Sequence, residues 1–155
     1  MSIVWQFATE SGLASAFIRF GTRCDWSHVD AVMPDGTLLG ARIEGGVQVR
    51  SPSYGKFSKL QRYKIETDRS ELFYEALKSQ IGKPYDWRAI IGFGLGDRDW
   101  QETDSWFCSE LQVWAMLQAG FFENAGFQKE LLIQTDRISP RDQLLLFSPW
   151  LVLYG

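Results

Sequence analysis

The sequence is poor in the residues from which metal centres and disulfide frameworks are built. It contains one histidine, His28, and two cysteines, Cys24 and Cys108. One histidine excludes a histidine-rich metal site, and two cysteines allow at most one disulfide bond. Cys24 and His28 are four residues apart, but a zinc site needs three or four protein ligands. We therefore expect no metal and no cofactor, and any imidazole chemistry must use His28.

Basic charge and long apolar runs are also scarce. The net charge is −3 and the isoelectric point is about 5.2, which argues against nucleic acid as a partner. The longest apolar stretches, such as LLLF and WLVLY, are far shorter than the ~20 residues of a membrane-spanning helix. The first ten residues lack the basic stretch of a signal peptide. These features predict a cytoplasmic protein with free thiols and no membrane span, and they leave its oligomeric state open.

The 155 residues are sufficient for one domain, which we expect to span 1–155. Hydrophobic residues make up 45% of the chain and charged residues 23%, a balance typical of a folded protein. Asp35-Gly36 is a strong turn signal between two apolar segments, and period-two alternation follows it. The order of elements predicts an α+β fold in which an antiparallel sheet packs against helices. We expect strands at 3–8, 27–33, 38–42, 47–50, 60–66 and 149–154, and helices near 11–20, 68–82, 106–118 and after Ser139.

Helix signals also predict faces and ends. Leu13, Ala16, Phe17 and Phe20 share one face of the first helix, and Gly21 suits its C-terminal cap. Asp68 and Glu71 have the spacing of a capping box, and Phe73, Leu77 and Ile81 form a stripe. The helix near 106–118 is apolar on almost every side, which is typical of a buried helix. Ser139, Pro140 and Asp142 suit the cap and first turn of the last helix.

Cys108 is the first candidate catalytic residue. If Asp104 or Ser105 caps the helix, Cys108 lies in its first turn, where unpaired backbone N–H groups carry partial positive charge. That position favours the nucleophilic thiolate, and the same N–H groups can stabilise an oxyanion. The alternative is that Cys108 is a small hydrophobic residue of the core, as most buried free cysteines are.

His28 is the second candidate, because a nucleophilic cysteine needs an imidazole within hydrogen-bond reach. By the period of two, it shares a strand face with Asp30. The alternative is a locally bonded histidine on an edge strand. Four tryptophans flank these segments and are candidates for the walls of a pocket: Trp26, Trp87, Trp100 and Trp106.

Both candidates lie within a set of five segments that follow one another along the chain: SHVDAVMPDGTLLGA, GGVQVR, GKPYDW, WFCSELQVWAM and ISPRDQLL. Together they resemble the circularly permuted papain-like hydrolases of the NlpC-type superfamily, relatives of the lecithin:retinol acyltransferase-like proteins. The resemblance extends from Trp5 to Leu146. It implies a permuted papain-like fold in which the histidine strand precedes the cysteine helix, with Cys108 as nucleophile and His28 as base.

The resemblance also implies roles for neighbouring residues. Tyr85 matches a tyrosine near the active site that lines the pocket or assists the oxyanion; the alternative is a packed tyrosine in a turn. Asp86 beside it is expected to be a structural hydrogen-bond acceptor. Many relatives carry a glutamate that orients the histidine at the place of Gly40, and often a glycine at the place of Asp30. Asp30, on the same strand face as His28, and Glu44, a few residues beyond Gly40, are the candidates for the third catalytic member. The alternatives are a solvated surface acid for either residue and, for Asp30, a residue that shapes the pocket.

Three functions follow from this pattern. The first is a cysteine amidase or peptidase that works through an acyl-enzyme on small amides or peptides, such as cell-wall peptides or amino-acid amides. With no signal peptide, a cell-wall substrate fits a phage- or prophage-encoded protein released by other means. The second is an acyltransferase, which an apolar channel near Trp87 or Trp106 would favour. The third is a binding module that has lost catalysis, for which Gly40 is the argument.

Overall fold

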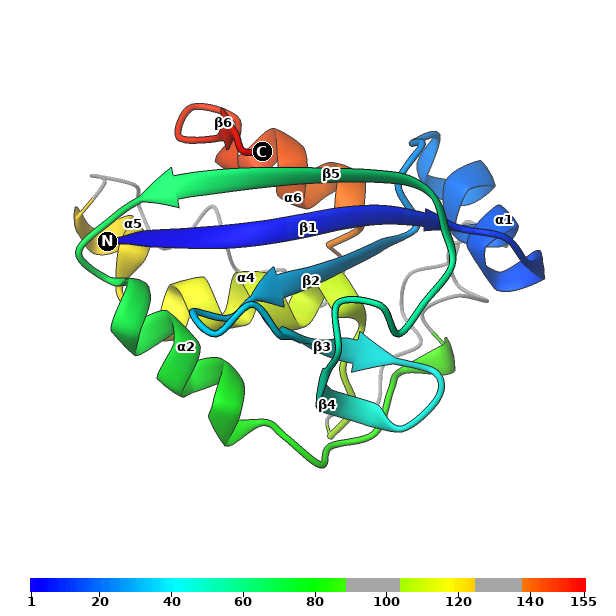
Figure 1. Cartoon of the computed structure of the whole chain (residues 1–155), viewed down its shortest axis with the longest axis horizontal. Coiled ribbons are helices and arrows are strands. Elements are labelled where there is room, and N and C mark those ends of the chain that lie inside the picture. The colour runs from blue at the N-terminus through cyan, green and yellow to red at the C-terminus, as the bar shows by residue number, and fades with distance from the viewer. Residues whose placement is uncertain (89–103, 125–137) are drawn as a thin grey trace.

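The computed structural model describes residues 1–88, 104–124 and 138–155, and its architecture is α+β, as predicted. One six-stranded sheet has the order β4-β3-β2-β1-β5-β6, and every neighbouring pair is antiparallel. Figure 1 shows the two longest strands, β1 and β5, side by side across the middle of the molecule. The strands are β1 (Ser2–Glu10), β2 (His28–Val32), β3 (Leu38–Arg42), β4 (Gly46–Arg50), β5 (Phe57–Glu66) and β6 (Val152–Leu153).

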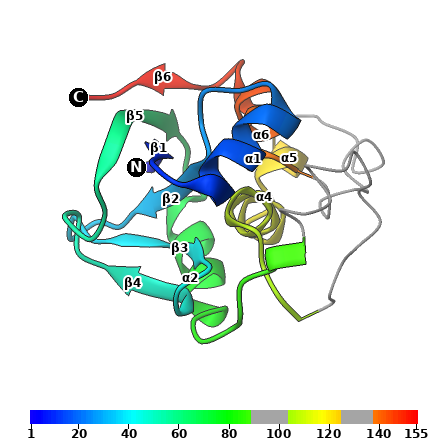
Figure 2. The same ribbon diagram turned by 90° about the vertical axis from the view of Figure 1, so that its right-hand side faces the viewer.

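Most helices cover one face of this sheet, as Figures 1 and 2 show. These are α2 (Ser70–Ser79), α4 (Cys108–Gln118), α5 (Phe121–Asn124) and α6 (Pro140–Phe147). Helix α1 (Leu13–Thr22) lies instead at one end of the sheet, after the end of β1. No helix within the three described ranges is long and apolar enough to cross a membrane.

The main core lies between the sheet and the helices, and a buried amide fixes α4 within it. Trp5, Phe73 and Phe147 pack edge to face in this core. The Trp5 indole Nε1 donates to Gln112 Oε1 over 3.2 Å, and Gln112 Nε2 donates to the Leu39 carbonyl over 3.2 Å. Helix α4 is thereby tied to both β1 and β3, which fixes the position of Cys108 at its first residue.

Several predicted helix ends were wrong. Gly21 lies inside α1, and the C-cap of that helix is Arg23, which adopts the left-handed conformation with φ of 50°. Neither Asp104 nor Ser105 caps α4: its N-cap is Phe107, whose backbone N–H donates to the Glu110 carboxylate over 3.1 Å. Cys108 nevertheless lies in the first turn, as predicted.

Of the caps predicted at the start of α2 and α6, the first is wrong and the second is confirmed. Asp68 does not cap α2, because the N-cap there is Arg69, whose backbone N–H donates to Thr67 Oγ1 over 3.1 Å. The predicted cap of α6 is confirmed, since the Ser139 hydroxyl accepts from the Asp142 N–H over 3.2 Å while Asp142 Oδ2 accepts from the Ser139 N–H over 2.9 Å.

Helix α1 buries the face opposite to its apolar side chains, although the apolar face is the one that the pattern favours for burial. Its buried residues are Ser15, Ile18 and Thr22, whereas Leu13, Ala16, Phe17 and Phe20 are exposed. The buried face is held by polar contacts: the Ser15 hydroxyl lies 2.6 Å from the Glu10 carbonyl and 2.8 Å from Ser27 Oγ. The four residues do share a face, but that face points away from the core.

Candidate active site

His28 and Asp30 meet on β2, where period-two alternation puts both side chains on one side of the strand. Nε2 of His28 lies 2.9 Å from Oδ1 of Asp30, and both side chains are buried. A buried imidazole and carboxylate this close stabilise each other's charged forms. Of the two residues predicted as candidates for the third catalytic member, Asp30 is therefore the one that contacts His28.

A chain of partly buried polar side chains continues from Asp30. The Tyr54 hydroxyl donates to Asp30 Oδ2 over 2.6 Å, and Arg42 Nη1 donates to the same hydroxyl over 2.7 Å. Arg42 also forms an ion pair with Glu10, and its guanidinium lies 4.6 Å from the centre of the Tyr54 ring. With one oxygen on His28 and the other on Tyr54, the Asp30 carboxylate has little freedom to rotate.

The absence of a side chain at position 40 is explained by the same carboxylate. β2 and β3 pair at Ala31 with Leu39, so the register puts Asp30 opposite Gly40. A Cβ added at Gly40 would lie 2.0 Å from Oδ1 of Asp30 and 3.1 Å from its carboxyl carbon. The Asp30 carboxylate therefore fills the space that a side chain at position 40 would occupy.

The pKa of His28 depends on residues of both β2 and α4. Burial alone lowers the pKa of His28, but the charge and hydrogen bond of Asp30, joined by those of Cys108, outweigh it and raise that pKa from 6.5 to about 10. Burial raises the pKa of Asp30, yet His28 and Tyr54 hold it below its usual value. The imidazolium is thus stabilised by the Asp30 carboxylate and, to a smaller extent, by Cys108.

Tyr85 is placed beside this pair by a short backbone bridge. Trp106 N–H donates to the Pro84 carbonyl over 3.1 Å, and Asp86 N–H donates to the Trp106 carbonyl over 3.0 Å. The segment around Tyr85 is thereby joined to the residues just before Cys108. Burial, together with the neighbouring charges of Cys108 and Asp86, raises the pKa of Tyr85 well above its ordinary value, which keeps the phenol protonated.

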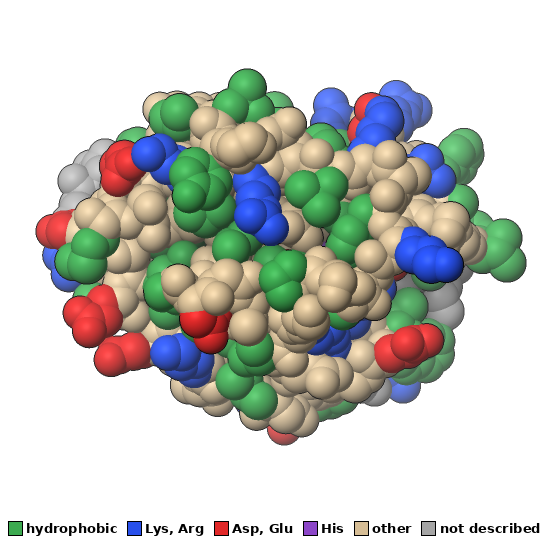
Figure 3. Space-filling view, in the orientation of Figure 1, with side chains coloured by type: hydrophobic (Ala, Val, Ile, Leu, Met, Phe, Trp, Pro, Cys, Tyr) green, Lys and Arg blue, Asp and Glu red, His purple; other side chains and the backbone are tan. Residues whose placement is uncertain are grey.

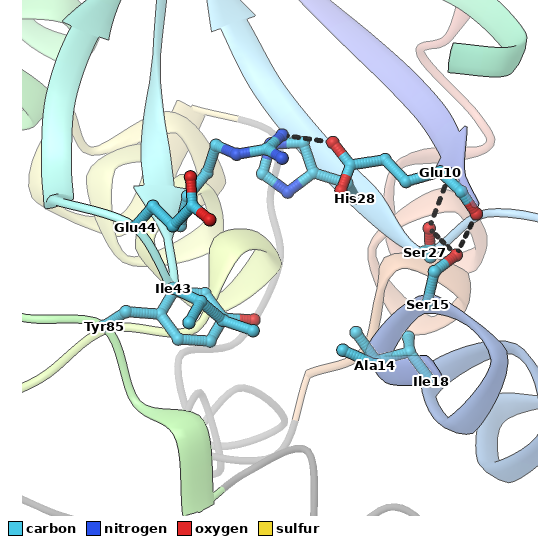
Figure 4. Close-up of a pocket in the computed structure, with 10 residues that line it drawn as sticks. Glu10, Ala14, Ser15, Ile18, Ser27, His28, Ile43, Glu44 and Tyr85 are labelled. Carbon is cyan, nitrogen blue, oxygen red and sulfur yellow. Dashed lines mark hydrogen bonds and ion pairs between the residues drawn. The ribbon is translucent and has the colours of Figure 1, made fainter. Parts of the chain in front are cut away.

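A pocket of about 210 Å³ opens onto His28 and Tyr85. Figure 4 shows the Tyr85 hydroxyl pointing into it, with Ala14 and Ile18 of α1 on the opposite wall. Its lining mixes apolar, hydroxyl and charged groups, so it has a polar character on the His28 side. The remaining lining residues are Glu10, Ser15, Ser27, Arg42, Ile43 and Glu44.

The other predicted site residues have different surroundings. Glu44 lies on the pocket wall beside Ile43 (Figure 4), and no contact within the described residues joins its carboxylate to His28. Asp86 is a structural acceptor as expected, since its Oδ1 accepts from the Arg88 N–H over 3.0 Å. Cys24 is a free thiol just after α1, and neither it nor the fully buried Cys108 is among the described residues that line the pocket.

Among the described residues, no tryptophan lines this pocket. Trp106 packs against Trp114, with ring centres 5.1 Å apart, and donates through Nε1 to Gln80 Oε1 over 3.2 Å. Trp87 is half exposed and Trp26 packs against Phe7. Trp100 lies outside the described residues. The three described tryptophans that were predicted as pocket walls therefore lie elsewhere.

Sequence reasoning missed Glu10, Arg42 and Tyr54. Alternation along β3 does put Arg42 on the same strand face as Gly40, which is a signal that could have found it. Tyr54 comes from the loop between β4 and β5, where no periodic pattern indicates the direction of a side chain. No group of three or more His, Cys, Asp or Glu residues that could hold a metal ion occurs in the parts of the chain that the structure describes.

Comparison with known proteins supports the fold. No family model matches the chain, and no curated protein matches it. A solved structure does. The crystal structure of metalloprotein yiiX from Escherichia coli O157:H7, DUF1105, aligns with a TM-score of 0.68. The alignment covers 100% of this chain and 96% of that one, at 18% sequence identity. At this identity the similarity shows a shared fold and carries no activity with it.

Proposed function

We propose that this protein is a cysteine-dependent hydrolase with a permuted papain-like fold, acting on amide bonds of small peptides or amino-acid amides. The observation that carries the proposal is the contact between His28 and Asp30, whose Nε2 and Oδ1 atoms lie 2.9 Å apart, together with Cys108 at the start of α4, which contributes to the raised pKa of His28. A nucleophile, a base and a group that orients the base are the three parts of such a catalytic set. The segment order quoted above supports the same assignment.

The proposed chemistry uses these groups in sequence. Nδ1 of His28, the ring nitrogen that Asp30 does not contact, takes the Cys108 thiol proton, and Sγ attacks the amide carbonyl carbon. The backbone N–H of Cys108, which helix geometry leaves without an intrahelical acceptor, and the Tyr85 hydroxyl stabilise the oxyanion. The imidazolium then protonates the departing amine, leaving a thioester. Water, deprotonated by His28, attacks that thioester and releases the acid and the free thiol.

The exchange between positions 30 and 40 supports a catalytic protein over an inactive binding module. In the family that this sequence resembles, a glutamate at position 40 orients the histidine and position 30 is often glycine. Here the carboxylate comes from position 30 and the glycine is at position 40. Because Asp30 Oδ1 lies where a side chain at position 40 would start, the orienting group has changed strands and has not been lost.

The lining of the pocket favours water over an apolar acyl acceptor. Glu10, Arg42 and Ser27 lie on its His28 side, and neither Trp87 nor Trp106 contributes to it. Acyl transfer to an amine or alcohol remains the second candidate, since it uses the same thioester. Adding glycerol or hydroxylamine to the reaction separates the two, because a transferase forms the corresponding ester or hydroxamate in preference to the acid.

The test is hydrolysis of a panel of aminoacyl, dipeptidyl and γ-glutamyl amides of 7-amino-4-methylcoumarin, with intact-mass detection of an acyl-enzyme. We expect Cys108→Ala and His28→Ala each to lower turnover about 10³-fold or more. Cys24→Ala is the matched control, because it removes the other free thiol and should leave turnover unchanged. Full activity in Cys108→Ala, or an acyl group found on another residue, would refute the proposal.

A further inference from the structure

The exposed face of α1 is the largest departure from the expected burial pattern. Leu13 is 80% exposed, Phe17 53% and Phe20 81%. Their spacing of four and three residues aligns them along one side of the helix. Large apolar side chains gathered on one exposed face usually mark an interaction surface. This apolar face, defined by Leu13, Phe17 and Phe20, needs a partner that accepts hydrophobic side chains.

The surroundings of the apolar face are basic, although the whole chain has a net charge of −3. Arg19 and Arg23 lie in the last turn and at the C-cap of α1, and Arg141 Nη1 donates to the Thr22 carbonyl over 3.3 Å. The acidic side chain next to them, Asp25, forms an ion pair with Lys59 over 2.6 Å. Figure 3 shows hydrophobic and basic side chains gathered together at the α1 end of the molecule.

We propose that the apolar face of α1 docks onto an anionic lipid surface. Phenylalanines beside arginines on a short amphipathic helix suit the boundary between headgroups and acyl chains, where rings insert and guanidinium groups bind phosphates. The basic corner of an acidic protein supplies the charge complementarity, which also orients the molecule on such a surface. This inference is independent of the proposed chemistry, because binding is measured without turnover.

Docking in this way would place the pocket close to the lipid surface. The opposite side of α1 supplies Ala14, Ser15 and Ile18 to the pocket wall. A helix about 10 Å across would therefore have lipid on one side and the pocket on the other. The substrates that reach His28 in this state are those held at or near the surface.

The experiment is co-sedimentation of the purified chain with phosphatidylcholine vesicles, with and without 30% phosphatidylglycerol. We expect binding to the anionic vesicles only, and weaker binding at 0.5 M NaCl, where charges are screened over a few ångströms. Phe17→Ser/Phe20→Ser should lower the partition coefficient at least about tenfold. Arg19→Gln/Arg23→Gln should lower it on anionic vesicles.

The control is Leu72→Ser/Ile81→Ser, which removes two half-exposed apolar side chains in and just after α2, away from α1, and should bind as the parent does. Circular dichroism checks that each variant folds. Failure of the parent chain to sediment with anionic vesicles overturns the proposal, as does an equal loss in the control. A concentration-dependent dimer that Phe17→Ser/Phe20→Ser abolishes, without vesicle binding by the parent, would assign the face to self-association instead.

Discussion

Gly40→Ala tests the contact between Asp30 and His28 with the smallest change in the chain. The added Cβ would lie 2.0 Å from Asp30 Oδ1, so that oxygen must retreat by about 1 Å to reach even a tight contact. Oδ1 is the same oxygen that lies 2.9 Å from His28 Nε2, and Oδ2 is held by Tyr54. The methyl group therefore separates the carboxylate from the imidazole or breaks its bond to Tyr54.

The expected cost has two parts. Overpacking of a filled site costs about 1–3 kcal/mol. Weakening the Asp30 contact costs about 1.4 kcal/mol for every pH unit by which the pKa of His28 falls. For a chain of this size, we expect the melting temperature to fall by roughly 3–10 °C at pH 6.

The pH dependence of this loss has a definite sign. The pKa of His28 is raised in the folded state, so its contribution to stability is complete below pH 6.5 and disappears as pH rises toward 10. The difference in melting temperature between the parent and Gly40→Ala should therefore be largest near pH 6 and shrink toward pH 10. Thermal unfolding followed by circular dichroism from pH 5.5 to 10 measures it.

A double-mutant cycle provides the control. In an Asp30→Ala background the clash is gone, so Gly40→Ala should cost little there, because the next nearest atom to the new Cβ, the Val29 carbonyl oxygen, lies 3.3 Å away. Equal costs of Gly40→Ala in both backgrounds would refute the reasoning, as would a variant whose stability and pH dependence match the parent.

Two further predictions concern Tyr54, which contacts Asp30, and Ser139, which caps α6. Tyr54→Phe removes the hydroxyl that donates to Asp30, so we expect a loss of about 1–3 kcal/mol in the free energy of unfolding and a higher pKa of Asp30; an unchanged free energy of unfolding in chemical denaturation would contradict the role of Tyr54. Ser139→Ala removes the cap of α6 and should cost about 1 kcal/mol in chemical denaturation, whereas Ser148→Ala, at the exposed end of the same helix, should cost less; the reverse order would contradict the cap.

Local signals predicted the elements that depend on local chemistry. The turn at Asp35-Gly36, where Asp35 Oδ1 accepts from the Thr37 N–H over 2.9 Å, fixed the hairpin and gave β3 its correct bounds. The Ser139 cap was found for the same reason. The pattern of α1 showed which residues share a face but not which face is covered, because burial there depends on Ser15 reaching Glu10 and Ser27.

The candidate site likewise has contacts that the sequence predicted and contacts that it did not. The contact between His28 and Asp30 follows from strand alternation, so the sequence predicted it as one of two candidates. The meaning of Gly40 depends on the register of β2 against β3, which no local pattern specifies. Tyr54 reaches Asp30 from a loop, over a sequence distance of 24 residues, and could be found only in three dimensions.

The most direct test of the central claim is a nuclear magnetic resonance titration of the imidazole, because the chain has only one histidine and its ring signals need no assignment. If His28 is held between Asp30 and Cys108, its pKa in the parent chain is about 10, and both Asp30→Asn and Cys108→Ser lower it. A pKa near 6.5 in the parent chain, or a value that neither substitution changes, would contradict the account.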